Sequence, residues 1–277
     1  NGRLAMSILT DDLMRQGFWG GLAGNLAYSS LLSVPGGNAN DCIGDGFNNG
    51  TFPLSVGHFR AVWGQTADSS NALGCIENAK VDSDIIQLKR VVSSVTAATA
   101  KEDDKFYLIS NMNSGEIFEG VDDVPVMDYG SIWEYQHHVY YVREDTINGN
   151  KVPILIKGHL LNTATFIDFN PIIDGIEMLR FTYGVDTDGD GVVNVFLSAD
   201  NMTKSYWDNE NDTRILAVTV YVLVRDLYPD YQYENKNTYQ LAGESVDFMN
   251  NEGEGDNYHR LLLTSTVTLY NARVDSW

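Results

Sequence analysis

The sequence predicts an α+β fold in which one N-terminal amphipathic helix packs on antiparallel β-sheet. Two observations support this class. Apolar residues recur at helical spacing between Arg3 and Gln16, whereas short segments of alternating apolar and polar residues follow one another from Asp84 onward. No internal repeat and no proline-rich linker divides the chain. We therefore expect a single domain over residues 1–277 with a large β-rich body.

The N-terminal segment has the pattern of an amphipathic helix. Leu4 and Ile8 lie four residues apart, as do Leu9 and Leu13, and Gly17 stands where a C-terminal cap is expected. No capping signal precedes the helix. It is therefore expected to be either the end of a longer helix or a short helix with a frayed start.

Composition divides the chain into three regions. Residues 1–20 hold the helix and its turn, residues 21–82 are rich in Gly, Asn and Ser, and residues 83–277 form the β-rich body. The middle region contains both cysteines, Cys42 and Cys75, outside any metal-binding spacing. We expect one disulfide between them; two unpaired buried thiols are the alternative.

The clearest strand signal is a hairpin. His138–Glu144 and Val152–Lys157 flank Asn148-Gly149, a pair typical of a two-residue turn. Pro153 has no backbone N–H, so its strand is expected at a sheet edge. Further strands are expected at Asp84–Arg90, Phe106–Ser110, Met178–Tyr183, Val218–Val224 and Leu261–Tyr270.

Charge and motifs narrow the possible functions. The chain has 18 Lys+Arg and 38 Asp+Glu, so its formal net charge of -20 repels nucleic acid and anionic membranes. Nucleic acid is not an expected partner. The sequence has no Walker loop, no Gly-x-Ser-x-Gly elbow and no His-Glu-x-x-His motif. We therefore expect a protein that is not an enzyme.

One acidic motif has the spacing of a calcium loop. Asp186, Asp188 and Asp190 alternate along the chain, and Gly191 follows them. Ca²⁺ binds six to eight oxygen atoms, and carboxylates at positions 1, 3 and 5 with glycine at position 6 fold around such an ion. The three aspartates are therefore expected to bind Ca²⁺. An acidic turn without an ion is the alternative.

The remaining ligands of this loop are less regular. The carbonyl of Val192 and the side chain of Asn194 occupy positions 7 and 9 of the pattern and are expected to take part. Leu197 stands at position 12, where an EF-hand has a bidentate Glu. A further ligand must therefore come from elsewhere, and Asp200 is the candidate.

Several segments resemble the PilW family of type IV pilus minor pilins. Asp174–Gly191 is similar to the family's C-terminal signature, in which a strand ending in Tyr-Gly-x-Asp leads into an acidic glycine loop. Val218–Arg225 and Leu261–Arg273 resemble its valine-rich and terminal strands. Gln16–Gly20 resembles the turn after the pilin helix, and Ser83–Arg90 resembles the next strand.

The resemblance implies a pilin-like fold and a structural role. In this family a hydrophobic first half of the helix and a processing site precede the part seen here. The protein would be held in the inner membrane through that helix alone, with its body in the periplasm, and be cut by prepilin peptidase. It would then join the extracellular pilus, or fimbrium. Its partners would be other minor pilins of the tip complex, which initiates pili that serve cell adhesion and twitching motility.

The resemblance also gives the helix a role in assembly. Leu4, Ile8 and Leu13 would form an apolar face that is left partly uncovered for partner helices. The body alone is expected to be largely monomeric. Two other functions remain open: a J-type minor pseudopilin of type II secretion, and a calcium-dependent adhesin or lectin.

Overall fold

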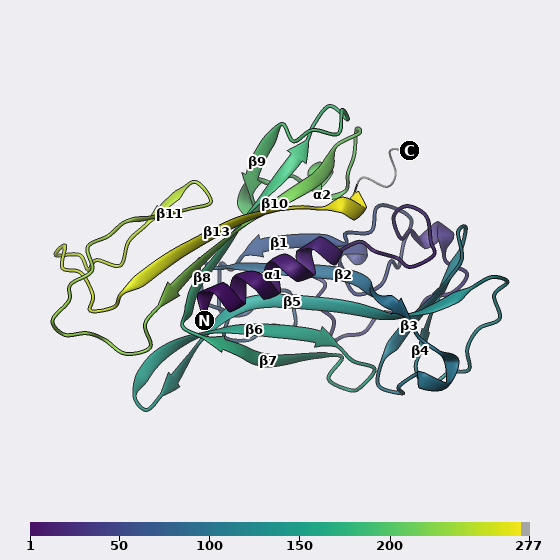
Figure 1. The fold of residues 1–277 in the computed structure, drawn as a ribbon, viewed down its shortest axis with the longest axis horizontal. Coiled ribbons are helices and arrows are strands. Elements are labelled where there is room, and N and C mark those ends of the chain that lie inside the picture. Colours follow the sequence, from purple (N-terminus) through teal and green to yellow (C-terminus); the bar gives the residue numbers. More distant parts are fainter. Residues whose placement is uncertain (273–277) are drawn as a thin grey trace.

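Two antiparallel sheets and one N-terminal helix form the frame of the protein (Figure 1). The computed structural model describes residues 1–272. The larger sheet has the order β1-β2-β5-β3-β4, with β6 beside β5 and β7 beside β6. Its strands are β1 (Val62–Thr66), β2 (Asp84–Val95), β3 (Phe106–Ser110), β4 (Gly115–Glu119), β5 (Ser131–Ile147), β6 (Asn150–Leu160) and β7 (Ile167–Asp174).

The second sheet, here the C-terminal sheet, has the order β13-β10-β8-β9. Its strands are β8 (Ile176–Asp186), β9 (Val195–Ser198), β10 (Arg214–Arg225) and β13 (Arg260–Thr268). A separate hairpin pairs β11 (Tyr239–Leu241) with β12 (Glu244–Val246). Short helices are α2 (Lys204–Trp207) and the 3₁₀ turns η1 (Tyr28–Ser30), η2 (Phe47–Asn49), η3 (Ala98–Ala100) and η4 (Ala199–Asn201). The α+β class with a β-rich body is therefore confirmed.

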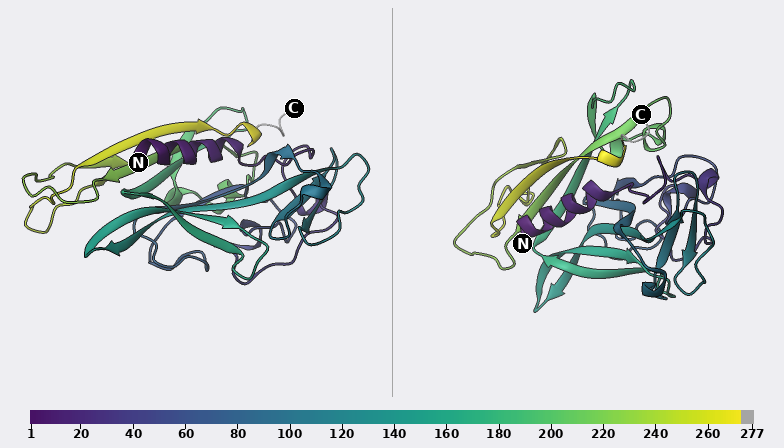
Figure 2. Two further views of the ribbon diagram at one scale, coloured as in Figure 1. Left: turned by 60° about the horizontal axis from the view of Figure 1, so that its bottom comes forward. Right: turned by 45° about the vertical axis from the view of Figure 1, so that its right-hand side comes forward.

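Helix α1 (Gly2–Arg15) lies within one residue of the predicted bounds. It packs mainly against β10 and β13 of the C-terminal sheet and also touches β2 of the larger one. Figure 2 shows it lying along β13, in the angle between the two sheets. The approach is close, because a Cβ at Gly2 would meet the side chains of Val224 at 2.5 Å and Leu263 at 2.8 Å.

The predicted hairpin joins β5 and β6. Asn148 and Gly149 both have positive φ, 51° and 81°, as a type I′ turn requires. The expectation that Pro153 marks an edge strand is wrong, because β6 pairs with both β5 and β7. The carbonyl of Pro153 accepts from Gly175 N, just beyond the end of β7. The position of the missing N–H of Pro153 is therefore opposite Gly175, where hydrogen bonding between β6 and β7 has already ended. The proline removes no hydrogen bond of the sheet.

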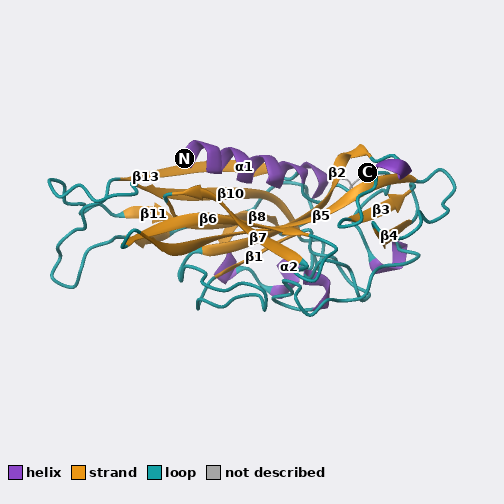
Figure 3. Ribbon diagram, turned by 90° about the horizontal axis from the view of Figure 1, so that it is seen from below, coloured by secondary structure: helices purple, strands orange, loops and turns teal. Residues whose placement is uncertain are grey.

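Residues 21–82 cover the face of the larger sheet opposite α1. The disulfide Cys42–Cys75 closes this region on itself. Buried side chains of the sheet bond its backbone: Gln87 donates to the Cys42 carbonyl at 2.7 Å, and Lys89 Nζ donates to the Asn49 carbonyl at 2.8 Å. The region also supplies strand β1, which sequence periodicity did not indicate. In Figure 3, α1 and the loops around β1 and α2 lie on opposite sides of the strands.

The two sheets are joined where β2 begins. Asp84 Oδ2 accepts the backbone N–H of Phe181 at 2.7 Å, and Asp84 Oδ1 lies 3.2 Å from a guanidinium nitrogen of Arg180. One continuous hydrophobic core then extends from α1 through both sheets to Leu269. Within residues 1–272, none of the helices has both the length and the apolar character needed to cross a lipid bilayer.

Candidate functional site

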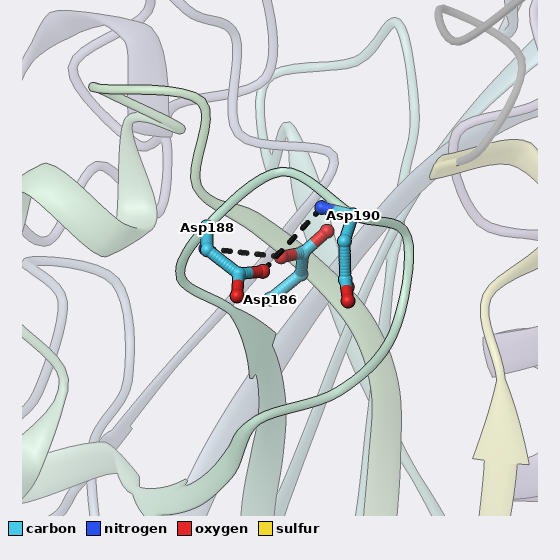
Figure 4. A group of neighbouring side chains, drawn as sticks. All are labelled: Asp186, Asp188 and Asp190. Atoms are coloured by element: carbon cyan, nitrogen blue, oxygen red, sulfur yellow. Dashed lines mark hydrogen bonds between the residues drawn. The ribbon is translucent and has the colours of Figure 1, made fainter.

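The acidic loop lies where the sequence placed it, at the end of strand β8. Asp186 is the last residue of that strand, and Asp188 and Asp190 follow in the loop (Figure 4). One carboxylate oxygen from each of the three lies within 4.8 Å of the other two. Hard cations bind to such groups of oxygen atoms.

Asp186 organises the loop from within. It is buried, whereas Asp188 and Asp190 are exposed. Its Oδ1 accepts N–H groups of Gly189 at 2.8 Å and Asp188 at 3.2 Å, and its Oδ2 accepts that of Gly191 at 2.8 Å. Burial acts to raise the pKa of Asp186, but these N–H groups outweigh it and lower the pKa below its ordinary value. The carboxylate is therefore ionised at neutral pH.

Asn194 and Val192 make contacts of their own in this loop. The amide oxygen of Asn194 accepts the backbone N–H of Thr187 at 2.6 Å and its hydroxyl at 3.1 Å. The N–H of Val192 donates to Asp190 Oδ1 at 2.8 Å. As a cation ligand, Asn194 would have to share its oxygen between the ion and Thr187.

Asp200 does not belong to the loop, so the suggestion that it completes the ligand set is wrong. Its carboxylate accepts the hydroxyl of Thr66 at 2.9 Å and lies 3.8 Å from Arg180. Ser198 on β9 pairs with Thr182 on β8. Because the two strands are antiparallel, the residues that follow Ser198, including Asp200, lie near Arg180. Asp186 is six residues further along that strand, about 20 Å away at the usual rise per residue.

Asp212 is the acidic residue that lies against the loop, and the sequence analysis missed it. A Cβ on Gly189 would lie 3.2 Å from Asp212 Cβ and 3.5 Å from its carbonyl oxygen. The pairing of Arg214 with Asp186 brings this segment alongside the loop. Loop spacing contains no signal for a residue that reaches the site through strand pairing.

The helix face predicted for assembly is partly exposed. Leu4 is 57% exposed and Ile8 is half-buried, but Leu13 is 0% exposed and belongs to the core. Leu13 shares its side of the helix with Ala5 and Leu9, which are also fully buried. The inclusion of Leu13 in the exposed face is therefore wrong. Leu4 and Ile8, at the margin of the buried side, form what is here called the helix stripe.

A buried ionic cluster fixes the orientation of this helix. Asp12, on the buried side of α1, accepts Arg90 Nε at 2.8 Å and the Tyr140 hydroxyl at 2.8 Å. His138 Nδ1 lies 2.5 Å from the same carboxylate. Burial opposes ionisation, but His138 and Arg90 hold the pKa of Asp12 well below its usual range. This set, here the Asp12 cluster, joins α1 to β2 and β5 and so determines which side of the helix faces outward.

The adjacent histidines of β5 serve opposite faces of the sheet. His138 faces α1, whereas His137 lies 2.9 Å from the Thr51 hydroxyl in the region that covers the other side. The strand aromatics Tyr135, Tyr140 and Tyr141 are buried. These side chains therefore pack the interior of the protein.

Comparison with protein families identifies the C-terminal half of the chain. The family model PilW, described as Type IV Pilus-assembly protein W, matches residues 139–271. This range contains β6 to β13 and the acidic loop; Arg273, the last residue of the resembling terminal segment, lies outside the described residues. No curated protein and no solved structure matches the chain. Through residues 139–271, the chain belongs to the PilW family of type IV pilus-assembly proteins.

Proposed function

We propose that this protein is a structural minor pilin that acts by assembly, and not by catalysis, in the initiation of type IV pili at the pilus tip. Family membership supports a role in pilus assembly and a location in the cell envelope or the pilus. The observation that carries the finer proposal is the placement of α1. Its inner side is fixed to the body by the core and the Asp12 cluster, while Leu4 stays 57% exposed.

This arrangement suits contact with other helices. An apolar residue held at the surface of a rigid helix loses little further conformational entropy when a partner covers it. The helix stripe is short, however, and interfaces that stay associated usually bury more than about 1,000 Å². The described body is therefore proposed to bind other minor pilins weakly by itself and to be largely monomeric.

A charge in the helix stripe tests this proposal. Leu4→Lys and Ile8→Lys, introduced together into the gene of the producing cell, should reduce the number of pili because a partner helix would have to desolvate the ammonium groups. Pili are counted by electron microscopy. The control is Leu32→Lys, a single added charge at an apolar residue outside α1 that is 68% exposed.

The purified double variant should stay folded with at most a modest fall in melting temperature, since Leu4 is exposed and Ile8 packs only partly buried against the core. Normal piliation by a stably folded double variant would overturn the assembly proposal. Loss of pili in the Leu32→Lys control would show that the assay responds to any added charge, and the proposal would then lose its support.

We also propose that the acidic loop binds Ca²⁺ through Asp186, Asp188 and Asp190. Asp212 is the proposed source of a further oxygen, because it lies against Gly189. The proposed role of the ion is structural. It would neutralise carboxylates gathered at the end of β8 and hold the loop in one conformation.

A further inference from the structure

A groove of about 330 Å³ lies on the larger sheet, on the same face as α1. Its floor consists of side chains from three neighbouring strands. His138 on β5 pairs with His159 on β6, and Lys157 on β6 pairs with Tyr140 on β5 and with Asn170 on β7. Because directly opposite residues of paired strands project to the same face, these side chains form two adjoining rows.

The groove reaches the helix through shared residues. His138 lines the groove and also contacts the carboxylate of Asp12 on α1. Tyr140 donates to that carboxylate, and Lys157 Nζ lies 5.5 Å from the centroid of its ring. A partner that packs along the outer side of α1 therefore meets the groove on the same face of the protein.

Lys157 is a cation without a direct ion pair among the described residues. Within residues 1–272 its ammonium makes no ion pair with a carboxylate, although the side chain is half-buried. Burial lowers its pKa, and the charge of Arg90 adds to this effect against the opposing influence of Asp12. By contrast, Lys105 in the same groove pairs with Glu102 at 2.7 Å and Glu134 at 3.3 Å.

The groove is less acidic than the protein as a whole. It is lined by two lysines, two histidines and the carboxylate of Glu134, whereas the chain has a formal charge of -20. Lys105 is already paired with Glu134, and Asp168 beside the groove lies 3.8 Å from His159. Lys157 is therefore the lysine of the groove that no carboxylate within residues 1–272 pairs with directly. A half-buried cation in such a place is stabilised by an incoming anion. A polyanion or a second copy of this chain would meet repulsion from the rest of the surface. A single carboxylate on a different protein would not.

We propose that this groove receives an Asp or Glu side chain of a neighbouring pilin-type subunit, with Lys157 as its counter-ion. The inference rests on the proposed function, since the partner is a subunit packed along α1. It adds the chemistry of the contact: a charged pair beside the apolar helix stripe. Such a pair selects among partners by the position of one acidic residue.

Zero-length cross-linking tests the contact directly. A carbodiimide couples an amine to a carboxylate that it already touches. Complexes isolated from producing cells through a tag on this chain are treated with the reagent, digested and analysed by mass spectrometry. We expect a peptide containing Lys157 to be joined to an acidic peptide of another pilus subunit. Lys151 is the internal control, because it lies on the same strand outside the groove and pairs with Glu144 at 3.0 Å.

Charge variants then measure the contribution of the pair. For the subunit identified by the cross-link, Lys157→Gln should weaken the Kd by about tenfold, as the loss of one charged hydrogen bond predicts, and Lys157→Glu should weaken it further. Exchanging the partner's acidic residue for Lys should restore binding to Lys157→Glu. Lys151→Glu should leave the Kd within about twofold, because it removes only an exposed pair.

The inference would be overturned by the absence of a cross-link at Lys157 in assembled complexes, by a cross-link only to a second copy of this chain, or by an unchanged Kd in Lys157→Glu. The proposed function fails separately. If Lys157 variants assemble normally while the Leu4 and Ile8 double variant does not, the groove contact is wrong and the assembly role stands.

Discussion

At the scale of single residues, Asp12 has the largest consequence for the structure. It is a carboxylate on the buried side of a helix; Arg90 is its counter-charge, Tyr140 donates a hydrogen bond to it, and His138 contacts it. A buried ion pair stabilises a protein little more than well-packed apolar side chains would in its place. Removing only one partner, however, strongly destabilises the protein, because the other charge stays buried and unpaired. The Asp12 cluster therefore acts mainly to specify how α1 sits on the sheets.

Asp12→Asn should lower the free energy of unfolding by about 3–5 kcal/mol, because Arg90 would stay buried without its counter-charge. Asp11→Asn is the matched control: its pair with Arg15 is exposed, and the change should be below about 1 kcal/mol. Denaturant unfolding measures both. Equal effects of the two substitutions would contradict a special role for Asp12.

The same residue predicts a pH dependence. The pKa of Asp12 is lower in the folded protein than in the unfolded chain, so its stabilising contribution is complete above the unfolded value of 3.8 and is lost as pH falls below it toward the folded value. Below about pH 4, where Asp12 titrates in the unfolded chain, stability measured from unfolding curves should therefore fall more steeply for the wild type than for Asp12→Asn. Parallel curves would show that Asp12 is not the group responsible.

Calcium binding is tested at the residues of the acidic loop. If Asp186, Asp188 and Asp190 hold an ion only in the folded state, calcium should raise the melting temperature relative to EDTA. The free energy of unfolding should rise by about 2.7 kcal/mol when free calcium is about 100 times the Kd. Asp188→Ala should abolish this difference, and Asp123→Ala, at another exposed loop carboxylate, should preserve it. If the melting temperature is the same with calcium and with EDTA, the loop is an acidic turn that binds no ion.

At the scale of elements, the region 21–82 depends on cross-links more than on regular structure. It contributes β1 and two short 3₁₀ turns. The rest of the region is held on the sheet by hydrogen bonds to its backbone from side chains such as Gln87 and Lys89. The disulfide spans a sequence separation of 33 residues within it. Since this region covers a whole face of the larger sheet, its order matters for the body as a unit.

Removal of the disulfide should therefore destabilise the protein. The variant Cys42→Ser with Cys75→Ser is expected to lose roughly 3–4 kcal/mol, because the unfolded chain regains the freedom of the closed loop. Thiol titration of the denatured, unreduced wild type should find no free thiol. Two reactive thiols per chain would contradict the pairing.

At the scale of the whole molecule, α1 packs against both sheets on one side and is exposed to solvent on the other. The C-terminal sheet supplies β10 and β13 as a base, and the larger sheet supplies the Asp12 contacts at the flank. The groove around Lys157 lies on the same face of the larger sheet as the helix, and His138 links the two through Asp12. An acidic body that has one half-buried lysine in a groove and an apolar helix stripe is suited to ordered contact with a few specific neighbours.

Local patterns determined much of this protein. The turn at Asn148-Gly149 followed from residues that tolerate positive φ, and the acidic loop followed from its own spacing after a strand. Phe106–Ser110 has the predicted bounds, and the helix and the C-terminal strands lie close to theirs. Each of these features depends on interactions between residues that are near one another in the chain, and a sequence records such interactions directly.

Tertiary structure alone decided the rest. Leu13 is buried and Leu4 is not, because two sheets contact α1 from different sides. Asp212, and not Asp200, lies beside the acidic loop. The register of the strands brings Asp212 close to the loop and places Asp200 farther along β8. The same holds for the counter-ions of Asp12 and for the groove at Lys157. These arrangements depend on pairings between strands far apart in sequence, and no local pattern in the chain specifies which distant side chain will arrive at a given place.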